Sequence, residues 1–168
     1  MRRCLLAVAV TLLASCGADT ASVGSPVAGD AITLISSSVL PSTVLDLEVT
    51  PEDVADQVAT ESRAFVDEIG LFGLRAGDLL KATLQVSRFN DDADLDRAAF
   101  RNRILREIGQ RVPEELRLGA DRVHVTTGNR QTIAIWFRGD HMMILSVRSD
   151  YDQPRRLLRE LLELDPSR

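Results

Sequence analysis

The sequence predicts an α+β domain with a largely antiparallel sheet of about five strands, in the element order α-β-β-α-β-β-β-α. Strand-like runs follow one another through short links that contain Gly with Asp or Asn, as antiparallel hairpins do. Segments with helical periodicity precede, separate and follow these runs. The part of the chain that carries the pattern, residues 46–168, has the usual length of a single domain.

The first half of this domain is expected to form one helix and one hairpin. Thr50 suits the N-cap and Pro51 the first helical position, which predicts a helix over residues 50–60. Residues 63–74 and 79–89 then read as two strands, with a Gly-Asp turn between them. Apolar and polar residues alternate in the second strand, so one of its faces should be buried and the other wet.

The second half is expected to contain the remaining helices and a three-stranded meander. An Asp-rich stretch offers caps for a helix over residues 95–111, whose apolar positions recur at helical spacing. Strands are predicted over residues 122–127, 131–138 and 141–148, linked by Gly-Asn and Gly-Asp turns. A last, Leu-rich helix should begin after Pro154, and the helices should cover at least one face of the sheet.

The N-terminal residues have the features of an export signal. Arg2 and Arg3 precede an apolar run over residues 4–13, which is shorter than the roughly 20 residues that a membrane span requires. The run ends in Leu13-Ala14-Ser15-Cys16, which resembles the bacterial lipobox. The resemblance implies that the cysteine is acylated and becomes the first residue of the mature chain.

This reading divides the chain into three parts. Residues 1–15 are a lipoprotein signal peptide, residues 16–45 are the acylated cysteine and a flexible tether, and residues 46–168 are the folded domain. Residues 31–35 could form a short strand within the tether. The alternative is an ordinary secretory signal cut near Ala18, in which Cys16 is incidental. If the lipobox is used, Cys16 holds the protein on the extracytoplasmic face of the cell membrane through at least two acyl chains.

Two further resemblances concern the folded part. The stretches LLKATLQVSRF and WFRGDHMMILSVR resemble uncharacterised lipoproteins of actinobacteria, a family that implies no activity. The expected element order is similar to that of PsbP/Mog1-like sandwiches, which implies a sheet packed with helices.

Acidic residues before the second helix alternate as calcium ligands do. Asp92, Asp94 and Asp96 match part of an EF-hand loop, but that loop also requires glycine at its sixth position and an acid at its twelfth. Arg97 and Arg103 stand at those two positions, so capping of the helix is the favoured interpretation.

The remaining motifs also favour structural roles. Arg138-Gly139-Asp140 spells an integrin-recognition tripeptide, although Gly-Asp is also what a tight turn requires. His124 and His141 are the only histidines and have no metal-ligand spacing. No nucleophile elbow or phosphate loop is present, so we expect no catalytic residues, no metal and no cofactor.

Composition and charge narrow the function classes. The formal net charge of −5 argues against nucleic-acid binding. An arginine stripe at Arg97, Arg101 and Arg106 could meet an anionic partner or lipid headgroups, although such a stripe is more often a solvated helix face.

The sequence therefore predicts a non-enzymatic, lipid-anchored binding or assembly module of the cell envelope, whose partner is the membrane and an unidentified envelope protein. The alternative is a carrier of an apolar ligand or lipid in a cavity between sheet and helices. Its candidate lining residues are Trp136, Met142, Met143 and Leu158.

Overall fold

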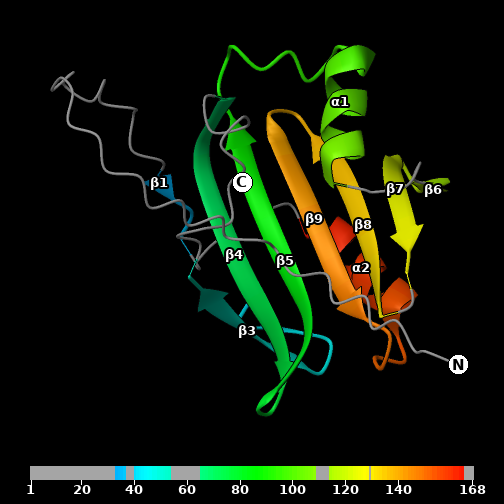
Figure 1. Ribbon diagram of the computed structural model, residues 1–168. Coiled ribbons are helices and arrows are strands. Elements are labelled where there is room, and N and C mark those ends of the chain that lie inside the picture. The colour runs from blue at the N-terminus through cyan, green and yellow to red at the C-terminus, as the bar shows by residue number, and fades with distance from the viewer. Residues whose placement is uncertain (1–32, 37–39, 54–64, 109–113, 129, 165–168) are drawn as a thin grey trace, which may run out of the picture.

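The computed structural model describes residues 33–36, 40–53, 65–108, 114–128 and 130–164. These residues form one nine-stranded sheet and two helices (Figure 1). In chain order the elements are β1 (Thr33–Leu34), β2 (Thr43–Val44), β3 (Leu47–Glu52), β4 (Val66–Ala76), β5 (Leu79–Phe89), α1 (Ala98–Ile108), β6 (Glu114–Leu118), β7 (Asp121–Thr127), β8 (Gln131–Arg138), β9 (His141–Arg148) and α2 (Pro154–Glu163). Neither helix is long and apolar enough to cross a membrane, within the residues described.

The strand order is β2-β3-β4-β5-β9-β8-β7-β6, and every neighbouring pair in it is antiparallel. The short β1 pairs in parallel with the first half of β4, beside Glu68 and Ile69, whereas β3 pairs with the second half. The β4–β5 hairpin is the longest ribbon, and β9 joins β5 only from Ala82 onward. The tip of this hairpin therefore extends beyond the strand beside it (Figure 1).

Each helix covers a different face of the sheet. The larger core contains Trp136, Met143 and Phe72 from the strands, together with four leucines of α2. The smaller core lies on the opposite face and contains Met142 and Ile135, packed against apolar residues of α1. Figure 1 shows α1 in front of the sheet and α2 behind it. The central strands read as continuously apolar because both of their faces are covered.

The prediction of an α+β domain with about five strands is wrong. The described chain is mostly one large antiparallel sheet with two short helices. The resemblance to PsbP/Mog1-like sandwiches rested on the predicted element order and loses its basis with it. The strands expected over residues 131–138 and 141–148 match β8 and β9, and β4, β5, β7, α1 and α2 also lie close to their expected ranges.

The helix predicted over residues 50–60 does not form at its expected first residues. Thr50 and Pro51 lie in β3, which pairs with β4, and residues 54–60 lie outside the described part of the chain. Pro51 cannot donate a backbone hydrogen bond, but it lies beyond the short stretch where β2 pairs with β3, at the edge of the sheet. Cross-strand pairing therefore overrides a local sequence that would suit a helix start.

β1 lies within residues 31–35, where the sequence allowed a short strand. The strands that the sequence did not predict are short or lie near an edge. β2 falls within residues 16–45, the range assigned to the tether, and Leu40 of that range is buried in the larger core. β6 has the sequence Glu-Glu-Leu-Arg-Leu, whose Glu residues are poor strand formers. It is joined to β7 by a turn in which Gly119 has φ +65°, a conformation that suits glycine.

Candidate functional site

A pocket of about 350 Å³ lies beside α1, at the end of the sheet where β4 begins. The loop between β5 and α1 and the first two turns of α1 supply most of its walls, and Phe65 closes it from the start of β4. The lining residues are Phe65, Asp92, Asp94, Arg97, Ala99, Phe100 and Arg103. This volume lies within the range of small-ligand sites.

Short-range hydrogen bonds hold the walls of this pocket in place. The Asn90 backbone N–H donates to the Phe65 carbonyl at 3.0 Å, which ties the end of β5 to the start of β4. The Asp92 backbone N–H donates to Asn90 Oδ1 at 3.2 Å, and the Arg97 backbone N–H donates to Asp94 Oδ1 at 3.1 Å. Asp94 therefore orders the approach to α1, in agreement with the capping role that the sequence favoured over calcium binding.

Two phenylalanines form the apolar wall of the pocket. Phe65 and Phe100 meet edge to face, with ring centroids 5.6 Å apart, and Phe89 also meets Phe100 edge to face, with centroids 6.4 Å apart. The Arg103 guanidinium lies over the Phe100 ring, 5.0 Å from its centroid. This wall of the pocket is therefore an aromatic surface that makes a cation–π contact with Arg103.

Charges of both signs face the same pocket. Asp92 and Arg97 are exposed, and within the described residues no ion pair is formed by either side chain. Arg103 contributes a second positive charge and Asp94 a second negative one. The pocket thus combines cations, anions and an apolar wall, a combination that suits a ligand with separated charges.

Charged residues of α1, β6 and β7 act on the His124 imidazole. Burial lowers the pKa of the His124 imidazole below its ordinary value, the charge of Glu115 opposes this shift, and the charges of Arg101 and Arg122 add to it. His124 is half-buried on the face that α1 covers. Of the three arginines in the predicted stripe, Arg101 is the one whose charge acts on His124.

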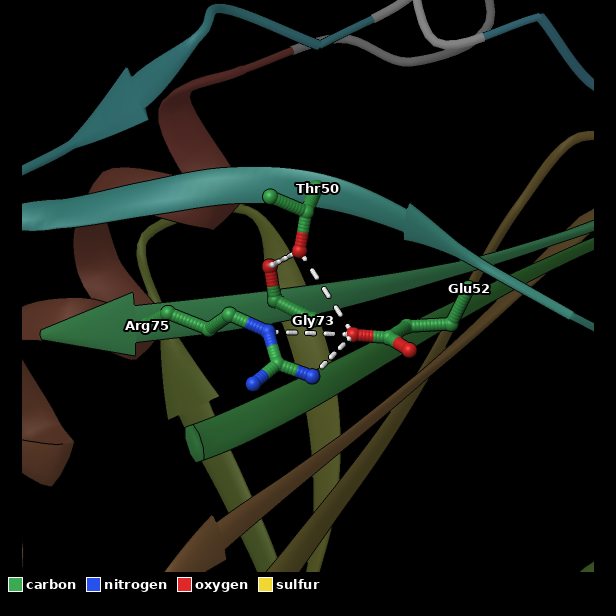
Figure 2. A network of polar contacts seen from close by, with 4 residues as sticks. All are labelled: Thr50, Glu52, Gly73 and Arg75. Carbon is green, nitrogen blue, oxygen red and sulfur yellow. Dashed lines mark hydrogen bonds and ion pairs between the residues drawn. The ribbon is translucent and has the colours of Figure 1, made fainter. Parts of the chain in front are cut away.

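A second polar cluster joins β3 to β4 (Figure 2). Arg75 donates from Nη2 and Nε to Glu52 Oε1, at 2.7 and 3.2 Å, and Thr50 Oγ1 donates to the same oxygen at 3.5 Å. Thr50 Oγ1 also lies 3.4 Å from the Gly73 carbonyl. A Cβ on Gly73 would clash with Glu52 Oε1. The polar groups of these residues bind one another, so we interpret the cluster as a structural link between β3 and β4.

A charged row crosses one end of the sheet, on the face that α2 covers. Glu68, Arg88, His141 and Arg138 are consecutive cross-strand partners on β4, β5, β9 and β8, and Arg138 binds Asp121 of β7. Arg88 Nη2 pairs with Glu68 Oε1 at 2.8 Å. The arginines of this row therefore form ion pairs with neighbouring carboxylates of the fold.

Arg138 is held inside this row and does not project from the hairpin tip. Its Nε and Nη2 donate to the two carboxylate oxygens of Asp121, at 3.0 and 2.8 Å. Its Nη1 donates to the Leu164 carbonyl at 2.9 Å, and its Nη2 donates to the Leu162 carbonyl. The Arg138-Gly139-Asp140 tripeptide is therefore a structural turn whose arginine caps the end of α2.

The two histidines lie on opposite faces of the sheet. His141 shares a face with Met143, and its Nδ1 lies 2.7 Å from Asp140 Oδ1 without a well-aligned hydrogen bond. His124 faces α1. Strand alternation thus separates the pair that a zinc site would have required. Among the residues described, no group of three or more His, Cys, Asp or Glu side chains could hold a metal ion.

The residues predicted to line an apolar ligand cavity do not share one space. Trp136, Met143 and Leu158 belong to the core beneath α2, whereas Met142 faces α1. All four are at most 7 % exposed. The Trp136 indole N–H is buried without a hydrogen-bond partner among the described residues, which fits its position in an apolar core.

Sequence reasoning found only part of the pocket beside α1. It singled out Asp92, Asp94 and Arg97 but not Phe65 or Phe100, because their contact depends on how α1 packs on the sheet. Cys16, the predicted lipidation site, lies outside the described residues. Comparisons with protein-family models, curated proteins and solved structures find no match for this chain.

Proposed function

We propose that this protein is a lipid-anchored module of the cell envelope that binds or assembles with a partner and has no enzymatic activity of its own. The observation that carries the proposal is the motif Leu13-Ala14-Ser15-Cys16, placed behind two arginines and an apolar run. In this proposal the acylated cysteine holds the folded part on the extracytoplasmic face of the membrane. At least two acyl chains make such an anchor stable.

The described fold is compatible with this arrangement. The sheet begins at Thr33, and the residues between Cys16 and Thr33 span at most about 60 Å when extended. The removal of residues 1–15 takes away Cys4 and leaves Cys16 as the sole cysteine. The folded part therefore relies on its two apolar cores and not on a disulfide, which suits an oxidising compartment where a second thiol could be mispaired.

Among the described residues, the matched polar groups favour a binding role over catalysis. The Arg75–Glu52 and Arg138–Asp121 pairs are satisfied within the fold. His141 lies beside Asp140, but the two are sequence neighbours at a turn, and Ser87 lies on the opposite face of the sheet. The His141–Asp140 pair therefore does not face this buried hydroxyl.

Mass spectrometry of the protein purified from its native membrane tests the anchor. We expect the mature chain to begin at Cys16 and to carry a diacylglyceryl mass on it. A Cys16→Ala variant should lack this mass and should no longer be processed at that position. A mature chain that begins downstream of Cys16, or an unmodified thiol there, would contradict the proposal.

Capture of partners tests the second half of the proposal. The acylated protein should co-purify from solubilised membranes with a specific envelope protein after chemical crosslinking. A matched sample of the Cys16→Ala variant separates contacts that need membrane attachment from contacts made by the folded part. Measurable turnover of cell-envelope substrates by the purified protein would contradict the non-enzymatic role.

A further inference from the structure

We propose that the pocket beside α1 binds the headgroup of a zwitterionic phospholipid, with its phosphate at Arg97 and Arg103 and its ammonium group at Asp92 and Asp94. The proposal deepens the proposed function, because the lipid anchor would keep the pocket near such headgroups. The chemistry of the pocket does not depend on the anchor. Both can therefore be tested separately.

The pocket matches this ligand in charge and in size. Arginine guanidinium groups form charge-assisted hydrogen bonds with phosphate oxygens, and carboxylates pair with ammonium groups. Arg97 and Asp92 each lie at the pocket without an ion pair to any described residue. A volume of about 350 Å³ can accommodate a glycerophosphoethanolamine group.

The apolar wall explains why the ligand should be a lipid headgroup and not a bare phosphate. Phe65 and Phe100 form a wall of two rings in edge-to-face contact, which inorganic phosphate could not use. The glycerol carbons and the first methylenes of an acyl chain can pack on such a surface. The mixture of two acids and two arginines also disfavours a purely anionic headgroup, which Asp92 and Asp94 would repel.

The pocket lies at the end of the sheet where an anchor would attach. Thr33, the first described residue, is paired with Glu68 near the start of β4, and Phe65 lines the pocket just before that strand. Figure 1 shows the start of β4, the end of β5 and α1 at the same end of the sheet. Two arginines of α1 and the loop before it, Arg97 and Arg103, line the pocket at this end.

Titration calorimetry on the full chain in uncharged detergent micelles tests the pocket. The probes are glycerophosphoethanolamine, glycerophosphoglycerol and inorganic phosphate. We expect glycerophosphoethanolamine to bind at least about tenfold more tightly than the other two, because only it offers both charges. Equal affinity for all three probes, or no binding, overturns the proposal.

Charge variants locate the site. Arg97→Glu should weaken binding at least about tenfold, and Asp92→Asn should reduce the preference for the ammonium-bearing probe. Arg159→Glu is the matched control, because Arg159 is an exposed arginine on α2, away from the pocket. Thermal unfolding of each variant verifies that it folds. If Arg97→Glu and Arg159→Glu bind equally well, the assignment is wrong.

Hydrogen exchange distinguishes a lipid from a free phosphate ester. The acylated protein is placed on vesicles of phosphatidylethanolamine or of phosphatidylglycerol, and exchange is measured over residues 92–108. We expect slower exchange on the phosphatidylethanolamine vesicles only. If exchange is equal on the two kinds of vesicle although glycerophosphoethanolamine binds in solution, the ligand is not a membrane lipid and the proposal is wrong. Failure of Cys16 acylation is measured separately by mass and does not affect the titration in micelles.

Discussion

Replacing Arg138 by Met should destabilise the protein by about 2–3 kcal/mol. The substitution keeps the aliphatic part of the side chain and removes the guanidinium, which holds Asp121 through two hydrogen bonds and the end of α2 through two more. Hydrogen bonds to charged groups contribute about 1.5–3 kcal/mol each when buried. The Arg138 and Asp121 side chains remain 23 % and 21 % exposed, which reduces the total through solvent screening.

Urea unfolding followed by fluorescence measures this loss directly. Trp136 is the only tryptophan and is 1 % exposed, so its emission should report the cooperative transition. A loss of about 2–3 kcal/mol lowers the urea midpoint by roughly 1–2 M at the slope usual for small domains. The slope itself should not change, because the same surface is exposed on unfolding.

Two controls test whether the hydrogen bonds of Arg138 account for the loss of stability. Arg148→Met also removes an arginine from an Asp pair, but Arg148 and Asp150 are exposed, so the midpoint should stay near that of the wild type. A double-mutant cycle of Arg138→Met with Asp121→Asn should give a coupling of about 1–2 kcal/mol. No coupling, or equal effects of Arg138→Met and Arg148→Met, would refute the reasoning.

Three further predictions concern single groups. Gly73→Ala should cost about 1 kcal/mol by displacing Glu52, and urea unfolding should show a smaller cost in a Glu52→Ala background. Burial, supported by Asp46, raises the pKa of Tyr151 to about 12. The phenolate absorbance of this sole tyrosine should therefore appear at a higher pH than for a free tyrosine, and at a lower pH in Asp46→Asn than in the wild type. The raised pKa also means that stability is lost as pH rises from about 10 toward about 12. The lowered pKa of His124 means that the unfolded chain takes up a proton first, so urea midpoints should fall as pH drops below about 6.5, and His124→Gln should flatten this fall.

Local pattern predicted the elements that carry their own signals. β8 and β9 match their predicted ranges because Gly139 and Asp140 mark the turn between them and both strands are rich in apolar residues. α2 begins at Pro154, next to the start expected just after that residue, and buries Leu157 with three neighbouring leucines at helical spacing. In each case one short stretch contains both the turn or cap signal and the periodicity.

Thr50 shows where local pattern fails. In sequence Thr50 and Pro51 suit a helix start, because threonine is a good N-cap and proline a good first helical residue. In the fold the Thr50 hydroxyl instead lies against the Gly73 carbonyl across β3 and β4, beside the Glu52–Arg75 ion pair. The pairing partner lies more than twenty residues away, so no local window contains it.

Local sequence was sufficient to predict the described hairpins and the helices α1 and α2, because each depends on the chemistry of adjacent residues. Long-range packing was needed to show that the sheet has nine described strands, that α1 and α2 cover opposite faces, and that Phe65 meets Phe100 beside Asp92 and Arg97. These features come from pairing and packing between distant segments. Their free energy depends on surfaces that exist only after the chain has folded.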